Sequence, residues 1–216
     1  MSVTKELDVS IRGAFGATSP GVSDRPASAA LENLLSDIQG SDPHVRTKAW
    51  QAAGEVGAVA VQPLAKVAEE GEMEVSRAAK RAMWQIVRYA GRPDGDGKEK
   101  DAVVSELVAL LSTSLSVPVR REVVRMLSEI GGNESVSAIS SLLSHSNLRE
   151  DARMALERIP GDESLEALKI ALNSVPQDFK PNVAQSLRAR GVEVEGIPCR
   201  KLVPTKQTNV KPLAAR

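Results

Sequence analysis

Few side chains in this sequence have the types and spacing that acid–base, nucleophilic or metal chemistry requires. The 216 residues include two histidines, His44 and His145, and one cysteine, Cys199. A structural zinc site takes closely spaced cysteine and histidine ligands, which three such distant residues do not supply. The sequence also shows no glycine-rich phosphate loop and no serine–histidine–aspartate arrangement. It therefore predicts no catalytic residues, no cofactor and no metal, and we interpret both histidines as loop or capping residues.

Cys199 is the one residue whose neighbours favour reactivity, because Arg200 and Lys201 follow it directly and adjacent cations can activate a thiol. The alternative is an ordinary thiol in an extended segment. A single cysteine forms no internal disulfide, which fits a reducing compartment. Between Met1 and Asp24 there is no apolar leader, and nowhere is there a run of about 18–20 apolar residues. We therefore expect a cytoplasmic protein that does not enter membranes.

Basic and aromatic residues form the best candidate binding site. The formal net charge is zero, with 28 lysines and arginines against 28 acids, but the charges are segregated between helices. The expected first helix of each repeat is acidic, and the second collects cations that would attract an anionic partner. The alternative is a solvated face whose arginines pair with Glu122, Glu150 and Glu157. The candidate partner-binding residues are Trp50, Arg77, Lys80, Arg81, Trp84, Arg121, Arg125 and Arg153.

A segment that recurs five times places these residues on helices. Its copies begin at Val45, Val75, Val119, Leu148 and Phe179, about 30, 44, 29 and 31 residues apart. Apolar residues at offsets of about 0, 4, 8 and 11 form one face of an α-helix, and the period is that of a helical solenoid. The sequence predicts an all-α, right-handed α-solenoid of about five antiparallel helix pairs. The predicted core contains Ala49, Ala53, Val56, Val123, Leu127, Ile130, Ala152, Leu156 and Ile159.

Composition divides the chain into three parts. Residues 1–27 are rich in small and polar residues without periodicity and are predicted to be a disordered N-terminal arm. Residues 28–191 form the predicted repeat domain, within which residues 92–101 are expected to be a solvated loop. Residues 192–216 are predicted to be an extended tail containing prolines and lysines. We expect residues 192–204 to fold back as a cap on the last helix pair, the alternative being a free binding motif.

The repeat resembles a known family in how its second helix opens and closes. A Val-Arg pair opens it, as at Val119–Arg120, and an apolar residue followed by glycine closes it, as at Ile130–Gly131. With the period near 30, this resembles HEAT repeats, and most of all the short bacterial type named after the phycobilisome lyases, over about residues 28–191. In that family the opening arginine commonly bonds to acids of adjacent repeats. The resemblance implies this role for Arg46, Arg120, Arg149 and Lys180.

The same resemblance implies an architecture more than an activity, because such repeats serve scaffolds, adaptors, lyases and DNA-repair proteins alike. We expect a non-enzymatic protein–protein interaction scaffold or adaptor that binds an acidic surface or segment on its concave, basic second helices. One alternative is nucleic-acid binding through the same surface, against which the zero net charge counts. Another is a chromophore-lyase-like protein, for which the sequence offers no acid, base or nucleophile.

Overall fold

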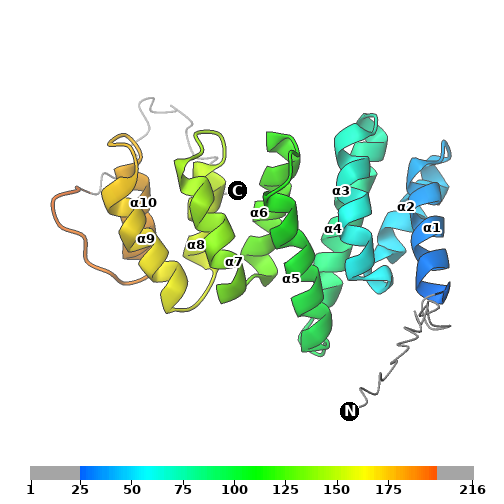
Figure 1. Cartoon of the computed structure of the whole chain (residues 1–216), viewed down its shortest axis with the longest axis horizontal. Coiled ribbons are helices and arrows are strands. Elements are labelled where there is room, and N and C mark those ends of the chain that lie inside the picture. Colours follow the sequence, from blue (N-terminus) through cyan, green and yellow to red (C-terminus); the bar gives the residue numbers. More distant parts are fainter. Residues whose placement is uncertain (1–24, 199–216) are drawn as a thin grey trace, which may run out of the picture.

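The structure, a computed structural model, describes residues 25–198, which form helices joined by short loops (Figure 1). Successive helices run in opposite directions and stack side by side along one axis. This confirms the predicted all-α, HEAT-like solenoid. Of the predicted N-terminal arm, residues 1–24 lie outside the described part, and the first helix begins at Arg25 rather than near Ser28. The α-helices are α1 (Arg25–Gln39), α2 (Pro43–Ala52), α3 (Val61–Glu70), α4 (Met73–Ala90), α5 (Gly97–Leu111), α6 (Val117–Ile130), α7 (Asn133–Ser141), α8 (Arg149–Arg158), α9 (Asp162–Ser174) and α10 (Lys180–Ala189).

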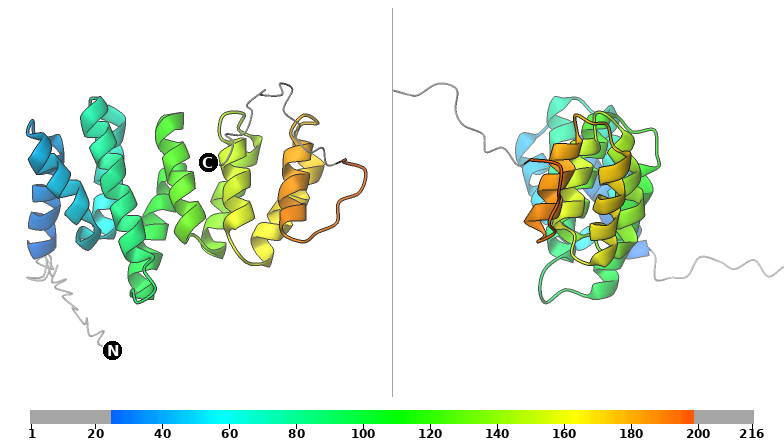
Figure 2. Two further views of the ribbon diagram at one scale, coloured as in Figure 1. Left: turned by 180° about the vertical axis from the view of Figure 1, so that it is seen from behind. Right: turned by 90° about the vertical axis from the view of Figure 1, so that its left-hand side faces the viewer.

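Helices alternate between two layers. Each odd-numbered helix contacts the next odd-numbered one, and each even-numbered helix contacts the next even-numbered one. We call the outer surfaces of these layers the odd-helix face and the even-helix face. Figure 2 shows the even-numbered helices in front in its left view, and the two layers end-on in its right view. The first helix of each predicted repeat therefore lies in one layer and the second in the other.

Capping side chains set several helix starts. Asp42 accepts a hydrogen bond from the backbone N–H of His44 at 2.8 Å, and Pro43 follows as the first residue of α2. Asp96 does the same for Lys98 at 3.0 Å. The prediction of a solvated loop over residues 92–101 is therefore wrong in its second half, because the Asp96 cap starts α5 at Gly97.

The apolar stripes meet between the two layers in a continuous core. Of the predicted core positions, Val123, Leu127 and Leu156 are fully buried, and the others are buried too except Val56, which is partly exposed. Gly54 lies in a short 3-10 helix, η1 (Ala53–Val56), that packs tightly on α4. A Cβ atom added at Gly54 would lie 2.8 Å from the Cβ atom of Tyr89. The backbone of η1 therefore lies directly against the Tyr89 side chain of α4, and this contact joins the first two helix pairs.

The segment after α10 stays in contact with the last helix pair. The backbone N–H of Val192 donates to the carbonyl of Leu187 at 2.9 Å, and Arg188 donates to the carbonyls of Val194, at 2.9 Å, and Ile197. Val192 and Val194 are partly buried against the core. Residues 199–204 of the predicted cap lie outside the described part, so the cap stays a prediction. In the described part, no helix is long and apolar enough to span a membrane.

Candidate partner-binding surface

The residues predicted to bind a partner all lie on even-numbered helices. Trp50 belongs to α2, and Arg77, Lys80, Arg81 and Trp84 belong to α4. The remaining three, on α6 and α8, are Arg121, Arg125 and Arg153. The offset pattern therefore places the whole set in one layer, but the surroundings of the individual residues differ strongly.

The two tryptophans are half-buried, and each lies beneath an arginine. Both indoles pack against the core while part of each ring stays exposed. The guanidinium carbon of Arg81 lies 5.5 Å from the ring centroid of Trp50, and that of Arg88 lies 5.5 Å from the ring centroid of Trp84. These distances fit cation–π contacts. We call Trp50, Arg81, Trp84 and Arg88 the tryptophan–arginine patch.

Sequence reasoning missed Arg88. It lies seven residues after Arg81, and residues seven apart share a helix face. The offsets that we collected ended nine residues after the start of each segment, whereas α4 continues to Ala90. Extending the periodic stripe to the end of this longer helix would have found it.

Arg121 and Arg125 share one carboxylate from the next repeat. The Nε atom of Arg121 lies 2.9 Å from one oxygen of Asp151, and the Nε atom of Arg125 lies 3.3 Å from the other. The Asp151 side chain is only 12% exposed, so this ion pair is better shielded from water than an ordinary surface pair. These contacts join α6 to α8 and neutralise much of the positive charge there.

Glu122 extends this network to α4. Its carboxylate accepts a hydrogen bond from the indole N–H of Trp84 at 3.1 Å and lies 3.3 Å from Arg125. The ring of Trp84 is therefore fixed by α6 as well as by its own helix. The alternative interpretation, in which the arginines pair with nearby acids, describes Arg125 well.

Arg153 is the most enclosed of the predicted site residues. Its side chain is 12% exposed and lies 2.6 Å from the carboxylate of Glu150 and 2.7 Å from that of Glu157. It also donates to the hydroxyl of Ser186 on α10. The hydrogen bond from Arg153 lowers the pKa of Glu150, and partial burial opposes that shift. These contacts make Arg153 a link between α8 and α10.

Uncompensated positive charge is concentrated on α4. In residues 25–198, Lys80, Arg81 and Arg88 lie within ion-pair distance of no carboxylate. Arg77 pairs with Glu74 at 3.0 Å, but the two side chains are 52% and 60% exposed, so the pair is weak. The cations available to a partner thus surround the two tryptophans and are scarce further along the row.

A cleft of about 350 Å³ opens beside Trp84, between α6 and α8. Met154, which is 49% exposed, and Ala155 form part of its wall, and Arg158 stands at its edge. Sequence reasoning did not select Met154, although it has an outward-facing offset, because only cations and tryptophans were collected. The cleft gives the patch a neighbouring hollow whose wall is partly apolar and partly charged.

The histidines serve local roles in the described part of the chain. The backbone of His44 is capped by Asp42, and the Nδ1 atom of His145 accepts a hydrogen bond from the backbone of Asn147 at 3.3 Å. No group of three or more histidine, cysteine, aspartate or glutamate side chains in residues 25–198 could hold a metal. Cys199 lies outside the described residues.

Of the three arginines that open second helices, Arg149 has the kind of partner that the resemblance implies, and Arg46 and Arg120 do not. Arg46 donates to the carbonyls of Ile38 at 3.2 Å and Gly40 at 2.5 Å, so it caps the end of α1 instead of binding an acid of an adjacent repeat. Arg149 does bind such an acid, Asp178, at 2.8 Å. The Nε atom of Arg120 is buried without a hydrogen-bond partner in the described part.

Comparison with known proteins relates part of the chain to a known repeat family. The family model of HEAT repeats matches residues 104–188, which extend from α5 into α10. No curated protein matched the chain. The match covers less than half of the sequence, and the helix pairs that precede it continue the same two layers. Residues 104–188 are therefore similar to HEAT repeats, and the described chain as a whole is a HEAT-like α-solenoid.

Proposed function

We propose that this protein is a non-enzymatic scaffold that binds an acidic segment of a protein partner on its even-helix face. HEAT repeats commonly serve as protein-interaction scaffolds. The observation that carries the proposal is the tryptophan–arginine patch. Its two arginines, Arg81 and Arg88, cover partly exposed indoles and have no carboxylate partner in the described part of the chain.

The patch combines the two contacts that an interface centre needs. Tryptophan and arginine bury large apolar surfaces and account for a large share of binding free energy in protein interfaces. The stems of Arg81 and Arg88 can stay against the indoles while their guanidinium groups bind carboxylates of the partner. Exposed charges contribute more to association rate than to affinity, so we expect binding to weaken as salt is added.

Nucleic-acid binding is the weaker alternative. A phosphate backbone needs many uncompensated cations, because its affinity comes from the counterions that those cations release. On this face Arg121, Arg125 and Arg153 already bind carboxylates of the chain itself. In the described part of the chain, the unpaired cations around the two tryptophans, Lys80, Arg81 and Arg88, form a compact group on α4, which suits a short acidic segment better than an extended polyanion.

The test compares two double charge reversals of equal size. Partners captured from an extract of the source organism are purified, and their affinity for the full chain is measured at several salt concentrations. We expect Arg81→Glu with Arg88→Glu to weaken binding by about tenfold or more, because attraction becomes repulsion at the patch. The matched control is Lys66→Glu with Lys98→Glu, two exposed lysines outside the even-helix layer.

Three results would contradict the proposal. The first is equal affinity of the patch variant and wild type. The second is equal loss in the control pair, which would show a response to net charge alone. The third is tighter binding of a single-stranded oligonucleotide than of any protein partner, which would favour the alternative. The melting temperatures of both variants must stay close to that of wild type for the comparison to hold.

A further inference from the structure

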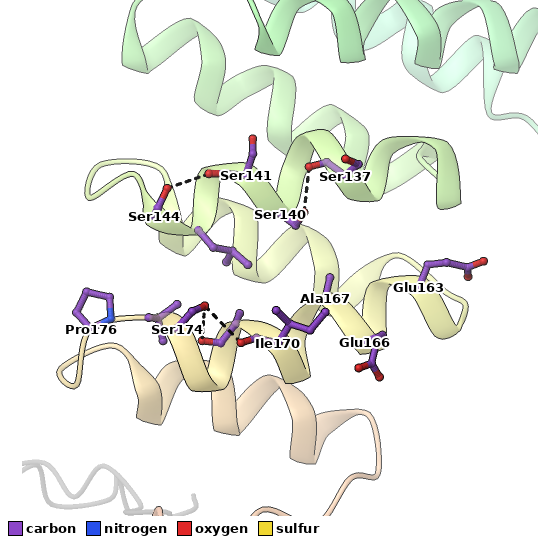
Figure 3. A pocket seen from close by; sticks show the side chains of 13 residues that line it. Ser137, Ser140, Ser141, Ser144, Glu163, Glu166, Ala167, Ile170, Ser174 and Pro176 are labelled. Atoms are coloured by element: carbon purple, nitrogen blue, oxygen red, sulfur yellow. Dashed lines mark hydrogen bonds between the residues drawn. The ribbon is translucent and has the colours of Figure 1, made fainter.

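A second hollow lies on the odd-helix face, away from the tryptophan–arginine patch. It is formed between α7 and α9 and has a volume of about 930 Å³ (Figure 3). Leu143, Ala171 and Val175 contribute buried apolar surface to it, and Ile170 projects into it with 61% of its surface exposed. We call it the α7/α9 pocket. An isoleucine so exposed beside an apolar floor is typical of a surface that another segment covers.

Three serine hydroxyls of the α7/α9 pocket donate hydrogen bonds within their own turns. The hydroxyl of Ser140 donates to the carbonyl of Ser137 at 2.9 Å, that of Ser144 donates to Ser141 at 3.1 Å, and that of Ser174 donates to Ile170 at 3.3 Å. Each proton is thereby used within its own turn, and the oxygen lone pairs stay available. Serines on both helices line the hollow (Figure 3), and these three can accept further hydrogen bonds.

Negative charge completes this pattern. Glu163 and Glu166 lie at one end of the α7/α9 pocket, and no lysine, arginine or histidine among residues 25–198 lines it. Lys169 pairs with Glu166 at 3.4 Å, but the two side chains are 47% and 60% exposed, so the pair neutralises little. The pocket therefore suits a segment that is apolar in part, rich in donors and positively charged.

The chain itself contains such a segment. Residues 199–216 include five lysines and arginines and no aspartate or glutamate, and they carry Leu202, Val203 and Leu213. The segment follows directly on residues 192–198, which curve around the outer side of the last helix pair (Figure 1). Eighteen residues reach up to roughly 60 Å when extended, whereas α9 is only about 20 Å long. The extended segment is therefore longer than the wall that α9 gives the pocket.

We propose that residues 199–216 bind in the α7/α9 pocket of the same chain. Leu202 and Val203 then cover the floor beside Ile170, and the cations lie against Glu163, Glu166 and the serine oxygens. Because both partners belong to one molecule, the local concentration is high and modest contacts suffice. The bound segment competes with any basic segment of another protein for the same pocket. The proposal is independent of the proposed scaffold function on the even-helix face.

The test uses the full chain with a nitroxide spin label. Cys199→Ser removes the single cysteine, and Asn209→Cys places the label within the segment. We expect the label to broaden the amide NMR signals of residues 137–144 and 167–174, with loss of intensity relative to the reduced, diamagnetic sample. Signals of α2 and α4 should keep their intensity, because these helices lie far along the stack from the pocket.

Paired variants separate pocket binding from a change of fold. Ile170→Lys places a charge on the exposed side chain, repels the basic segment and should restore the intensities. Met154→Lys makes the same change at a 49% exposed residue on the even-helix face and should leave the broadening intact. Glu163→Lys, also at an exposed residue, provides a second pocket variant should Ile170→Lys lower the melting temperature.

A mixed sample identifies the source of the segment. Isotope-labelled chains without a spin label are mixed with spin-labelled chains at natural abundance. Broadening that is seen when the isotope label and the spin label are on the same chain, but not in the mixed sample, supports binding within one chain. Broadening in the mixed sample would assign the pocket to a second copy and overturn the proposal. Unbroadened pocket signals in every sample, or broadening unaffected by both pocket variants, would also overturn it.

Discussion

Arg77 and Arg121 occupy the same offset in successive repeat segments, yet their contacts differ. Arg77 meets the exposed Glu74 of its own helix, whereas Arg121 meets Asp151 of the next repeat at 2.9 Å. The offset predicted which face each arginine lies on, and this was right. The partner could not be predicted from the offset, because it depends on the residue that the next repeat supplies. Asp151, three residues after the start of its segment, supplies it for Arg121, whereas Glu122 at the same offset binds Trp84 of the preceding repeat instead of Arg77.

The contrast between enclosed and exposed arginines gives the first prediction. Arg153→Ala should lower the free energy of unfolding by about 1–3 kcal/mol, because it leaves Glu150, Glu157 and Ser186 without their shared donor. Arg77→Ala should change it by no more than about 0.5 kcal/mol, because its pair is open to solvent. Urea denaturation measures both. Equal effects would mean that Arg153 is as loosely held as a surface residue.

The lowered pKa of Glu150 gives a pH dependence with a definite sign. The folded state binds its proton less tightly than the unfolded state, so this group stabilises the fold above its usual pKa of 4.5. That stabilisation is lost as the pH falls through the lowered pKa of the folded state. We therefore expect wild type to be more stable than Glu150→Gln at neutral pH and the difference to shrink in acid. Thermal melts across this range measure the difference, and one that grows in acid would reverse the assigned sign.

At the scale of helices, caps and close approaches fix what hydrophobic periodicity leaves open. The periodicity predicted the sequence of helices, but it missed the first turn of α5, because Gly97 and Lys98 look like loop residues without the Asp96 cap. A cap is a hydrogen bond from a backbone N–H to one polar side chain, and the spacing of apolar residues carries no information about it.

The close approach of η1 to α4 gives a prediction at this scale. Gly54→Ala should destabilise the fold by about 1–3 kcal/mol, because the added methyl group would lie 2.8 Å from Tyr89. Gly97→Ala is the matched control, since a Cβ atom there meets nothing within 4 Å, and alanine should be neutral or slightly stabilising. Chemical denaturation of the two variants checks the contrast. Equal stability of both would show that η1 can move away from α4 at little cost.

At the scale of the molecule, the stack predicts that damage spreads to neighbouring pairs and fades with distance. Leu127 is fully buried in α6 near the middle of the stack. Leu127→Ala should cost about 2–5 kcal/mol and increase hydrogen exchange in α4 and α8 more than in α1 and α10. Hydrogen-exchange mass spectrometry resolves these helices. Uniform acceleration along the whole chain would instead indicate a single cooperative unit.

The polar contacts between repeats also give the solenoid a stiff side and a compliant side. Trp84 with Glu122, Arg121 with Asp151, and Arg153 with Ser186 tie successive even-numbered helices together. No hydrogen bond joins two odd-numbered helices in residues 25–198. Under tension or on binding a longer partner, the odd-helix layer should therefore spread first, while the spacing of the even-helix layer changes little. The solenoid would then bend by widening its odd-helix layer, and the tryptophan–arginine patch would lie on the layer whose length changes least.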